Sequence, residues 1–213
     1  MRLLALLVIS LLCFPVFSEK LVNGTAGTIG KTLITVEDLY FYRALQRFIE
    51  GSGNPLALEE GVELKKTLQK VLFEEMVYAE MKSFRFEGQT REAAENLIRA
   101  QRALKGKEAV WREILKRFGR SESAAIDRVL KSLDAEKFVQ KKAETLTPII
   151  TEGEAERYYK QNQSRFQGST FESLKANIVL LLKKERMQKG LEEWVNFLKE
   201  KYEVSSLLGE YTA

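Results

Sequence analysis

The chain has 213 residues, of which 45% are apolar and 30% are charged, with 34 Lys and Arg against 30 Asp and Glu. This length and composition suffice for a buried core and exclude an intrinsically disordered chain. The sequence contains no histidine, and its single cysteine is Cys13. These two absences exclude a Ser-His-Asp triad, a Cys-His pair and the usual zinc sites, which need His or Cys ligands.

The first residues predict an export signal. Arg2 precedes an apolar run of about fifteen residues, and Val16 and Ser18 fit the small residues required before a cleavage point. We therefore expect residues 1–18 to be a signal peptide that is cleaved after Ser18. The mature chain would then contain no cysteine and could form no disulfide bond.

Two alternatives to cleavage are open. The segment would be a retained membrane anchor if it stayed uncut, although its apolar run is shorter than the ~20 residues that a bilayer-spanning helix needs. Cys13 would carry a lipid in a lipoprotein, although the residue before such a cysteine should be small and is Leu12 here. After cleavage we expect the protein not to span a membrane.

The charge distribution does not indicate a nucleic-acid partner. The formal net charge is +4, and basic residues alternate with acidic ones. Pairs at i,i+4 such as Glu108–Arg112 and Glu113–Arg117 favour a solvated helix face. Adjacent carboxylates such as Glu74 and Glu75 do not face each other on a helix, so we expect no acid–base pair there. No metal or cofactor is expected.

The mature chain is predicted to begin with two short strands or one β-hairpin. β-branched residues within 21–34 flank a turn at Gly30-Lys31. A helix should follow from Thr35 to about Ile49, because Thr35 is followed by an acid at the third helical position, as in a capping box. Residues 51–55, which contain two glycines and a proline, should end this helix.

Helical patterns continue through most of the remaining chain. Helices are expected at 57–83, at 90–104, after Gly106, after a cap at Ser121, at 151–161 from a capping box at Thr151, and at 169–202 from another at Ser169. The helix after Gly106 has apolar residues at i, i+3, i+4 and i+7, namely Trp111, Ile114, Leu115 and Phe118. Residues 204–208 should form a last strand. The predicted fold class is therefore mainly α, with several helices and a small β element formed by the N-terminal hairpin and the C-terminal strand.

Surplus aromatic residues are the candidate binding residues. Tyr40, Phe41 and Tyr42 are consecutive, so they cannot all face one core. Aromatic side chains left outside the core would line an exposed apolar groove, and such surfaces mark binding sites. The candidates are Phe41, Tyr42, Phe48, Phe84, Phe86, Trp111, Phe118, Tyr158 and Phe166. The sequence alone does not divide them between core and groove.

One segment carries a family resemblance. Residues 150–166 resemble the I-T-x-x-E-x-x-x-Y-Y-x-x-N-x-x-x-F helix of the SurA/PrsA-type periplasmic chaperones and their parvulin relatives. Residues 28–39 are similar to the opening hairpin and first helix of that family, and 121–142 to the helix that precedes the I-T-x-x-E segment. Residues 171–198 resemble its long C-terminal helix. The resemblance covers most of residues 22–208, and the order of its pieces is its most specific feature.

The chain departs from the family at one place. In that family a parvulin peptidyl-prolyl isomerase domain usually lies between the Tyr-Tyr-Asn helix and the C-terminal helix, whereas here only residues 167–170 fill the gap. Parvulin sites typically use histidines, which this chain lacks. The resemblance therefore implies the chaperone module without the isomerase, and we expect no enzymatic activity.

The resemblance also implies a function. It indicates a periplasmic, ATP-independent chaperone, or holdase, that binds unfolded or partly folded outer-membrane or secreted proteins and assists their folding. The expected organisation is a signal peptide, 1–18, followed by one SurA N-terminal-like helical domain, 19–213. The alternative is a non-catalytic assembly subunit of the cell envelope that binds one specific folded partner. Association of the chain into a homodimer is left open.

Overall fold

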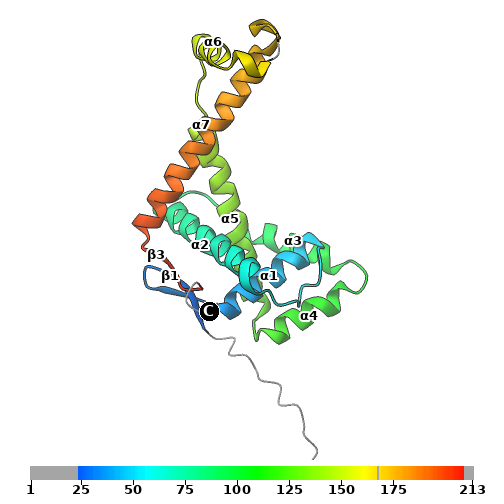
Figure 1. Ribbon diagram of the computed structural model, residues 1–213. Helices are drawn as coiled ribbons and strands as arrows, with labels where there is room; N and C mark the ends of the chain where they lie inside the picture. Colours follow the sequence, from blue (N-terminus) through cyan, green and yellow to red (C-terminus); the bar gives the residue numbers. More distant parts are fainter. Residues whose placement is uncertain (1–23, 167, 209–213) are drawn as a thin grey trace, which may run out of the picture.

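The computed structural model describes residues 24–166 and 168–208. The predicted signal peptide, 1–18, and its cleavage point lie outside the described residues. The described chain is mainly helical, with a small antiparallel sheet formed by strands from both ends of the chain, which confirms the predicted fold class. Figure 1 shows a body of packed helices beside the sheet, and a helical arm that projects from the body.

The sheet joins the two ends of the described chain. Its strands are β1 (Thr25–Ile29), β2 (Thr32–Thr35) and β3 (Val204–Ser206), in the order β2-β1-β3. β1 and β2 form the predicted hairpin, and Gly30 in its turn has a φ of 52°. β3 pairs antiparallel with β1, so that Gly27 lies opposite Ser206. A Cβ atom on Gly27 would come within 2.7 Å of the Ser205 carbonyl oxygen, so this pairing requires glycine.

The helices follow the predicted order. They are α1 (Val36–Glu50), α2 (Gly61–Ser83), α3 (Arg91–Arg102), α4 (Lys107–Arg117), α5 (Glu122–Leu146), α6 (Glu152–Gln161) and α7 (Phe171–Lys201), with a short 3-10 helix (Gln163–Phe166) before α7. Thr35 and Thr151 both form capping boxes, with Asp38 and Glu154 respectively. Ser121 caps α5. These caps confirm three of the predicted helix starts, because their side chains satisfy backbone N–H groups that have no partner within the helix.

The predicted start of α2 at residue 57 is wrong by one turn. The helix begins at Gly61, because the preceding Glu59 turns inward and its side chain is buried. The Glu59 carboxylate accepts hydrogen bonds from Arg47 at 2.7 Å and from Thr67 at 2.8 Å. A buried carboxylate needs such partners, and here they hold the chain in an extended form before the helix.

The predicted cap of α7 is also displaced by one residue. The N-cap is Thr170 rather than Ser169, and its side chain makes no capping hydrogen bond to the helix backbone. The Thr170 hydroxyl instead lies 3.3 Å from the Ser173 hydroxyl. Both residues are good caps by type, so the sequence alone could not choose between them.

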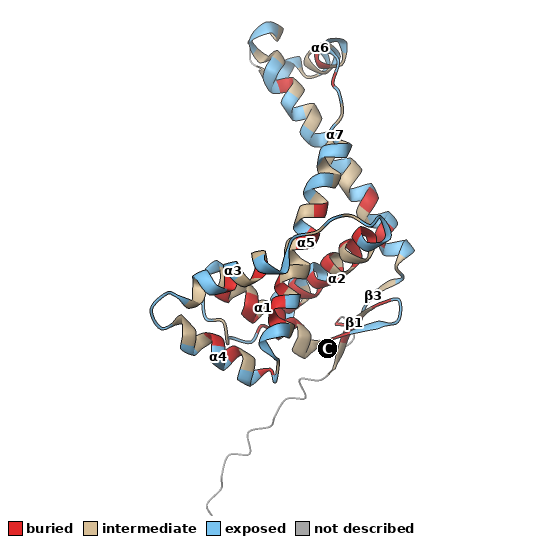
Figure 2. Cartoon of the chain, turned by 180° about the vertical axis from the view of Figure 1, so that it is seen from behind, coloured by how far each residue is buried: buried red, intermediate tan, exposed pale blue. Residues whose placement is uncertain are grey.

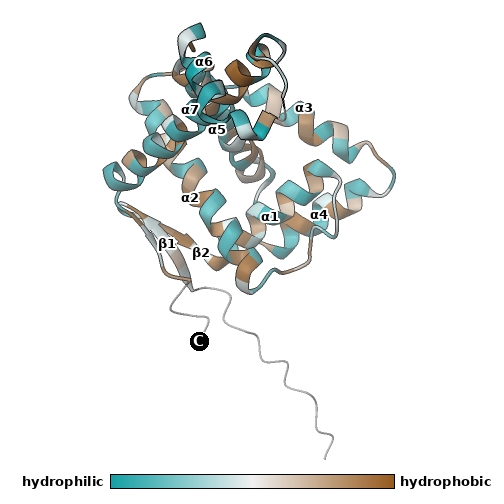
Figure 3. Cartoon of the chain, turned by 45° about the horizontal axis from the view of Figure 1, so that its top comes forward, coloured by the Kyte–Doolittle hydropathy of each residue, from teal (hydrophilic) through white to brown (hydrophobic). Residues whose placement is uncertain are grey.

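Two hydrophobic clusters fill the body. One lies between the sheet, α1, α2, the middle of α5 and the end of α7, with Leu68, Met76 and Leu198 at its centre. Figure 3 shows apolar segments in the hairpin and in α2, which packs against β1. The other lies among α1, α3, α4 and the start of α5, where the rings of Phe48 and Trp111 are 5.2 Å apart. Burial of each large side chain stabilises the fold by about 1.5–3 kcal/mol.

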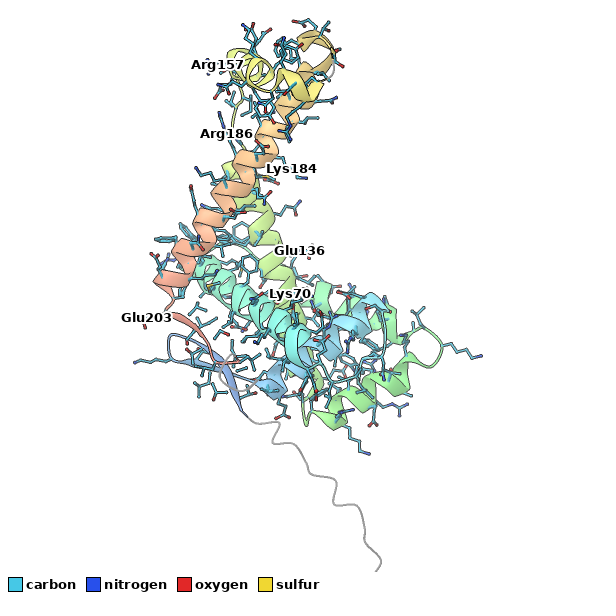
Figure 4. The ribbon with its side chains drawn as sticks, viewed as in Figure 1. Lys70, Glu136, Arg157, Lys184, Arg186 and Glu203 are labelled. Atoms are coloured by element: carbon cyan, nitrogen blue, oxygen red, sulfur yellow. The ribbon has the colours of Figure 1, made fainter. Side chains whose placement is uncertain are left out.

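The arm consists of the end of α5, α6, the short 3-10 helix and the first half of α7. Figure 2 shows that its residues are mainly exposed or half-buried, whereas buried residues concentrate where the helices of the body meet. Ion pairs and contacts between aromatic rings hold α6 in place. Arg186 of α7 forms an ion pair with Glu154 of α6 at 2.5 Å, and the ring of Tyr159 stacks on Phe166 with 5.5 Å between centroids. In Figure 4, Arg157 of α6 and Arg186 of α7 are labelled within this arm.

Acid should loosen the start of α6. The Glu154 carboxylate accepts hydrogen bonds from the Thr151 backbone N–H and from Arg186, and these lower the pKa of Glu154 from 4.5 to about 2. Because the pKa is lower in the folded chain, the stabilisation is complete above pH 4.5 and disappears as the pH falls towards 2. We expect amide exchange in 152–161, measured between pH 4.5 and 2, to depend less on pH in Glu154→Gln than in the natural chain. Equal pH dependence in both would contradict this assignment.

Candidate functional site

The nine aromatic candidates occupy three different places. Five are buried in the body and pack helices together: Phe41, Tyr42, Phe48, Trp111 and Phe118, each at most 7% exposed. These five side chains are enclosed among the helices of the body and therefore belong to the core. Tyr158 and Phe166 lie half-buried in the arm, with ring centroids 6.4 Å apart. Phe84 and Phe86 follow α2 and line a hollow in the surface.

This hollow is the candidate functional site. It has a volume of about 480 Å3 and lies where the end of α2, the second half of α5 and the second half of α7 come together. We call it the aromatic groove and define it by Phe84, Phe86, Phe138, Trp194 and Phe197, together with Glu80, Lys141, Lys142 and Thr145. Its volume is within the range of about 300–1,000 Å3 that is typical of ligand sites.

Phe138 is the centre of the groove. Its ring centroid lies 5.1 Å from that of Phe86, 6.2 Å from Trp194 and 6.4 Å from Phe84. Phe138 and Trp194 are less than 10% exposed and form the floor. Phe84 and Phe197 are 68% and 54% exposed and stand at the edge. Large aromatic side chains exposed beside a hollow are typical of a binding surface rather than of a finished core.

The loop after α2 is held against α5. The Gln89 backbone N–H donates to Asp134 at 2.5 Å, and the Lys137 ammonium donates to the Gly88 carbonyl at 2.9 Å. A Cβ atom on Gly88 would lie 2.3 Å from the Asp134 carboxylate, so glycine allows this close approach. These contacts fix the loop that carries Phe86 and so position one side of the groove.

The end of α7 is held against α2. The carboxylate of Glu80, a residue only 3% exposed, accepts hydrogen bonds from Lys201 at 2.5 Å and from Tyr202 at 2.7 Å. The hydrogen bond to Glu80 raises the pKa of Lys201, and burial raises the pKa of Tyr202. Both groups therefore remain donors at neutral pH. This contact fixes the helix that carries Trp194 and Phe197 on the other side of the groove.

Lysines surround the aromatic rings. The ammonium of Lys142 lies 5.7 Å from the centroid of Trp194, that of Lys137 5.8 Å from Phe86, and that of Lys201 5.8 Å from Phe197. Cations over aromatic faces are attracted by the ring quadrupole. The site thus combines an apolar floor with a cationic edge. Within the part of the chain that the structure describes, no cluster of Asp and Glu has the geometry to hold a metal ion.

Glu74 and Glu75 have separate partners. Glu74 is buried and accepts hydrogen bonds from Tyr42 at 2.6 Å and from Arg128 at 2.5 Å, whereas Glu75 accepts from Lys131 at 2.9 Å. Burial, followed by the charge of Glu74, raises the pKa of Tyr42 far above its usual value, so its hydroxyl remains a donor. The two carboxylates are therefore directed to different partners, as their adjacent positions in the helix predict.

Three aromatic residues of the groove, Phe138, Trp194 and Phe197, are absent from the predicted set. Trp194 lies on the apolar stripe of α7 with Leu191 and Leu198, and it is buried in the floor. Phe197 lies three residues later, beside the stripe, and this spacing is the signal that could have indicated an exposed aromatic on the same side. For Phe138 no local signal exists, because its groove neighbours come from other helices.

A comparison of the chain with protein-family models, with curated proteins and with solved structures found no match. The relation to SurA/PrsA-type chaperones therefore stays a prediction from residues 150–166 and from the order of the surrounding segments. Among the helices in residues 24–166 and 168–208, none is both long enough and apolar enough to cross a membrane.

Proposed function

We propose that this chain is a periplasmic, ATP-independent chaperone that holds unfolded outer-membrane or secreted proteins until they fold. The observation that carries the proposal is the aromatic groove with its two exposed phenylalanines, Phe84 and Phe197. Unfolded chains expose aromatic and aliphatic side chains that folded proteins bury. Apolar area removed from water contributes about 25 cal/mol per Å2 to binding, so such a groove gives many sequences moderate affinity.

The fixed walls of the groove suit a holdase. The loop after α2 and the end of α7 are each held by hydrogen bonds to a buried carboxylate, Asp134 or Glu80. A groove that is already formed loses little conformational freedom when a client binds, so no nucleotide-driven closure is needed. Release then follows from weak individual contacts. The proposed activity uses no catalytic group and no cofactor.

The family resemblance supports the same function. Residues 150–166 resemble the SurA/PrsA-type signature, and the predicted signal peptide would direct the chain to the compartment where those chaperones act. Only residues 167–170 lie where that family usually has its isomerase domain, so the resemblance does not extend to isomerase activity. The proposal is therefore limited to binding of unfolded chains, without prolyl isomerisation.

An aggregation assay tests the proposal. A denatured outer-membrane barrel protein is diluted from urea into buffer with residues 19–213, and light scattering is followed in time. We expect suppression of aggregation at a near-stoichiometric ratio. No suppression, together with no binding of unfolded peptides, would contradict the proposal. Co-purification of a single folded partner at fixed stoichiometry, without suppression, would instead support the assembly-subunit alternative.

A further inference from the structure

The charges that line the aromatic groove do not cancel. Lys141 and Lys142 of α5 line it, and among the described residues that line it Glu80 alone is acidic. The Glu80 carboxylate already accepts hydrogen bonds from Lys201 and Tyr202. Its charge is therefore neutralised within the protein, and the charge that the groove presents to a ligand is positive.

Lys142 is the cation with the least compensation. Its ammonium lies over the Trp194 ring, and it forms no ion pair with a carboxylate in residues 24–166 or 168–208. Lys141 pairs with Glu144 at 2.8 Å, but both side chains are more than half exposed, so this pair contributes little and opens easily. On α7, Glu193 is adjacent to Trp194 in sequence, but its side chain is 69% exposed, so water screens its charge.

We propose that the aromatic groove selects extended client segments in which an aromatic residue is flanked by Asp or Glu. This inference rests on the proposed function and names its substrate class. The aromatic side chain inserts between Phe84 and Phe197 onto the floor formed by Phe138 and Trp194. Residues along an extended chain are spaced by about 3.3 Å, so a carboxylate one or two positions away reaches the Lys142 ammonium.

Three labelled peptides of equal length test the selection. Each contains a central Phe flanked on both sides by Glu, by Gln or by Lys, and binding to residues 19–213 is measured by fluorescence anisotropy. We expect the Glu peptide to bind about fivefold more tightly than the Gln peptide, the amount that two partly exposed ion pairs supply, and the Lys peptide to bind most weakly. The Glu-to-Gln ratio should approach one in 1 M NaCl, where the Debye length is about 3 Å.

Two variants locate the effect. Lys142→Gln should reduce the Glu-to-Gln ratio at low salt, whereas Lys160→Gln, which removes a lysine of α6 outside the groove, should leave it unchanged. Equal binding of all three peptides, or an unchanged ratio in Lys142→Gln, would overturn the inference. If all three peptides bind with equal affinity and Phe197→Ser abolishes this binding, the groove binds peptides without selecting their charge. The inference then fails, while the chaperone proposal stands. If no peptide binds, the inference fails and the aggregation assay decides the proposed function separately.

Discussion

Replacing Phe84 and Phe197 with serine is expected to weaken suppression of client aggregation at least tenfold. These side chains are 68% and 54% exposed, so they are available to a client and contribute little to the core. Covering one phenylalanine contributes about 1.5–3 kcal/mol, and each 1.4 kcal/mol corresponds to a factor of ten in affinity. The measurement is the chaperone-to-client ratio that halves light scattering of a denatured barrel protein.

The matched control replaces two exposed apolar residues outside the groove. Val62 and Leu104 are 67% and 52% exposed, and Val62→Ser with Leu104→Ser should leave suppression unchanged. Substitutions at exposed positions usually change stability by about 0.5 kcal/mol or less each, so both double variants should unfold close to the natural chain. Equal loss of activity in the two double variants would show that exposed apolar residues in general, and not the aromatic groove, suppress aggregation.

The largest loss of stability is expected from Glu74→Ala. The buried Glu74 carboxylate accepts hydrogen bonds from Tyr42 of α1 and from Arg128 and Ser132 of α5, and so joins three helices. Removing it leaves a largely buried guanidinium, 15% exposed, without its partner. Breaking a buried pair in this way costs about 3–5 kcal/mol. Urea denaturation followed by circular dichroism would measure the change in the free energy of unfolding.

The next residue provides the control. Glu75 pairs with Lys131 at 2.9 Å, and the two side chains are 20% and 28% exposed. Because water still reaches both groups, Glu75→Ala should lower the free energy of unfolding by about 1 kcal/mol or less. Similar losses for Glu74→Ala and Glu75→Ala would contradict the assignment of Glu74 as the contact that joins α1, α2 and α5.

Local signals in the sequence were sufficient for the order of elements. The hairpin around Gly30, the capping boxes at Thr35 and Thr151 and the cap at Ser121 were predicted from neighbouring residues, and the structure confirms them. Each depends on contacts within a few residues along the chain, and such contacts can be derived from spacing and side-chain chemistry. The start of α2 could not be predicted in this way, because Glu59 is held by arginines of another helix.

The candidate site depends on long-range packing, which the sequence did not indicate. An aromatic residue on a helix face predicts burial or binding, and only the arrangement of helices decides between them. Phe41 and Trp111 are core residues because α1, α3, α4 and the start of α5 pack together around them. Phe84 is exposed because α2 ends at this position. The floor joins Phe138 and Trp194 from two helices, and no local pattern relates these positions.

The pairing of β3 with β1 has a consequence for the order in which the protein matures. The sheet is complete only when β3, the last described strand, pairs with β1, the first. The helix that directly precedes β3, α7, supplies Trp194 and Phe197 to the groove. Closing such a long loop is an entropically costly and late event in folding. The groove is therefore assembled only when the chain has been made as far as β3 and has closed the sheet, so the proposed binding activity would begin only after the protein has completed its own fold.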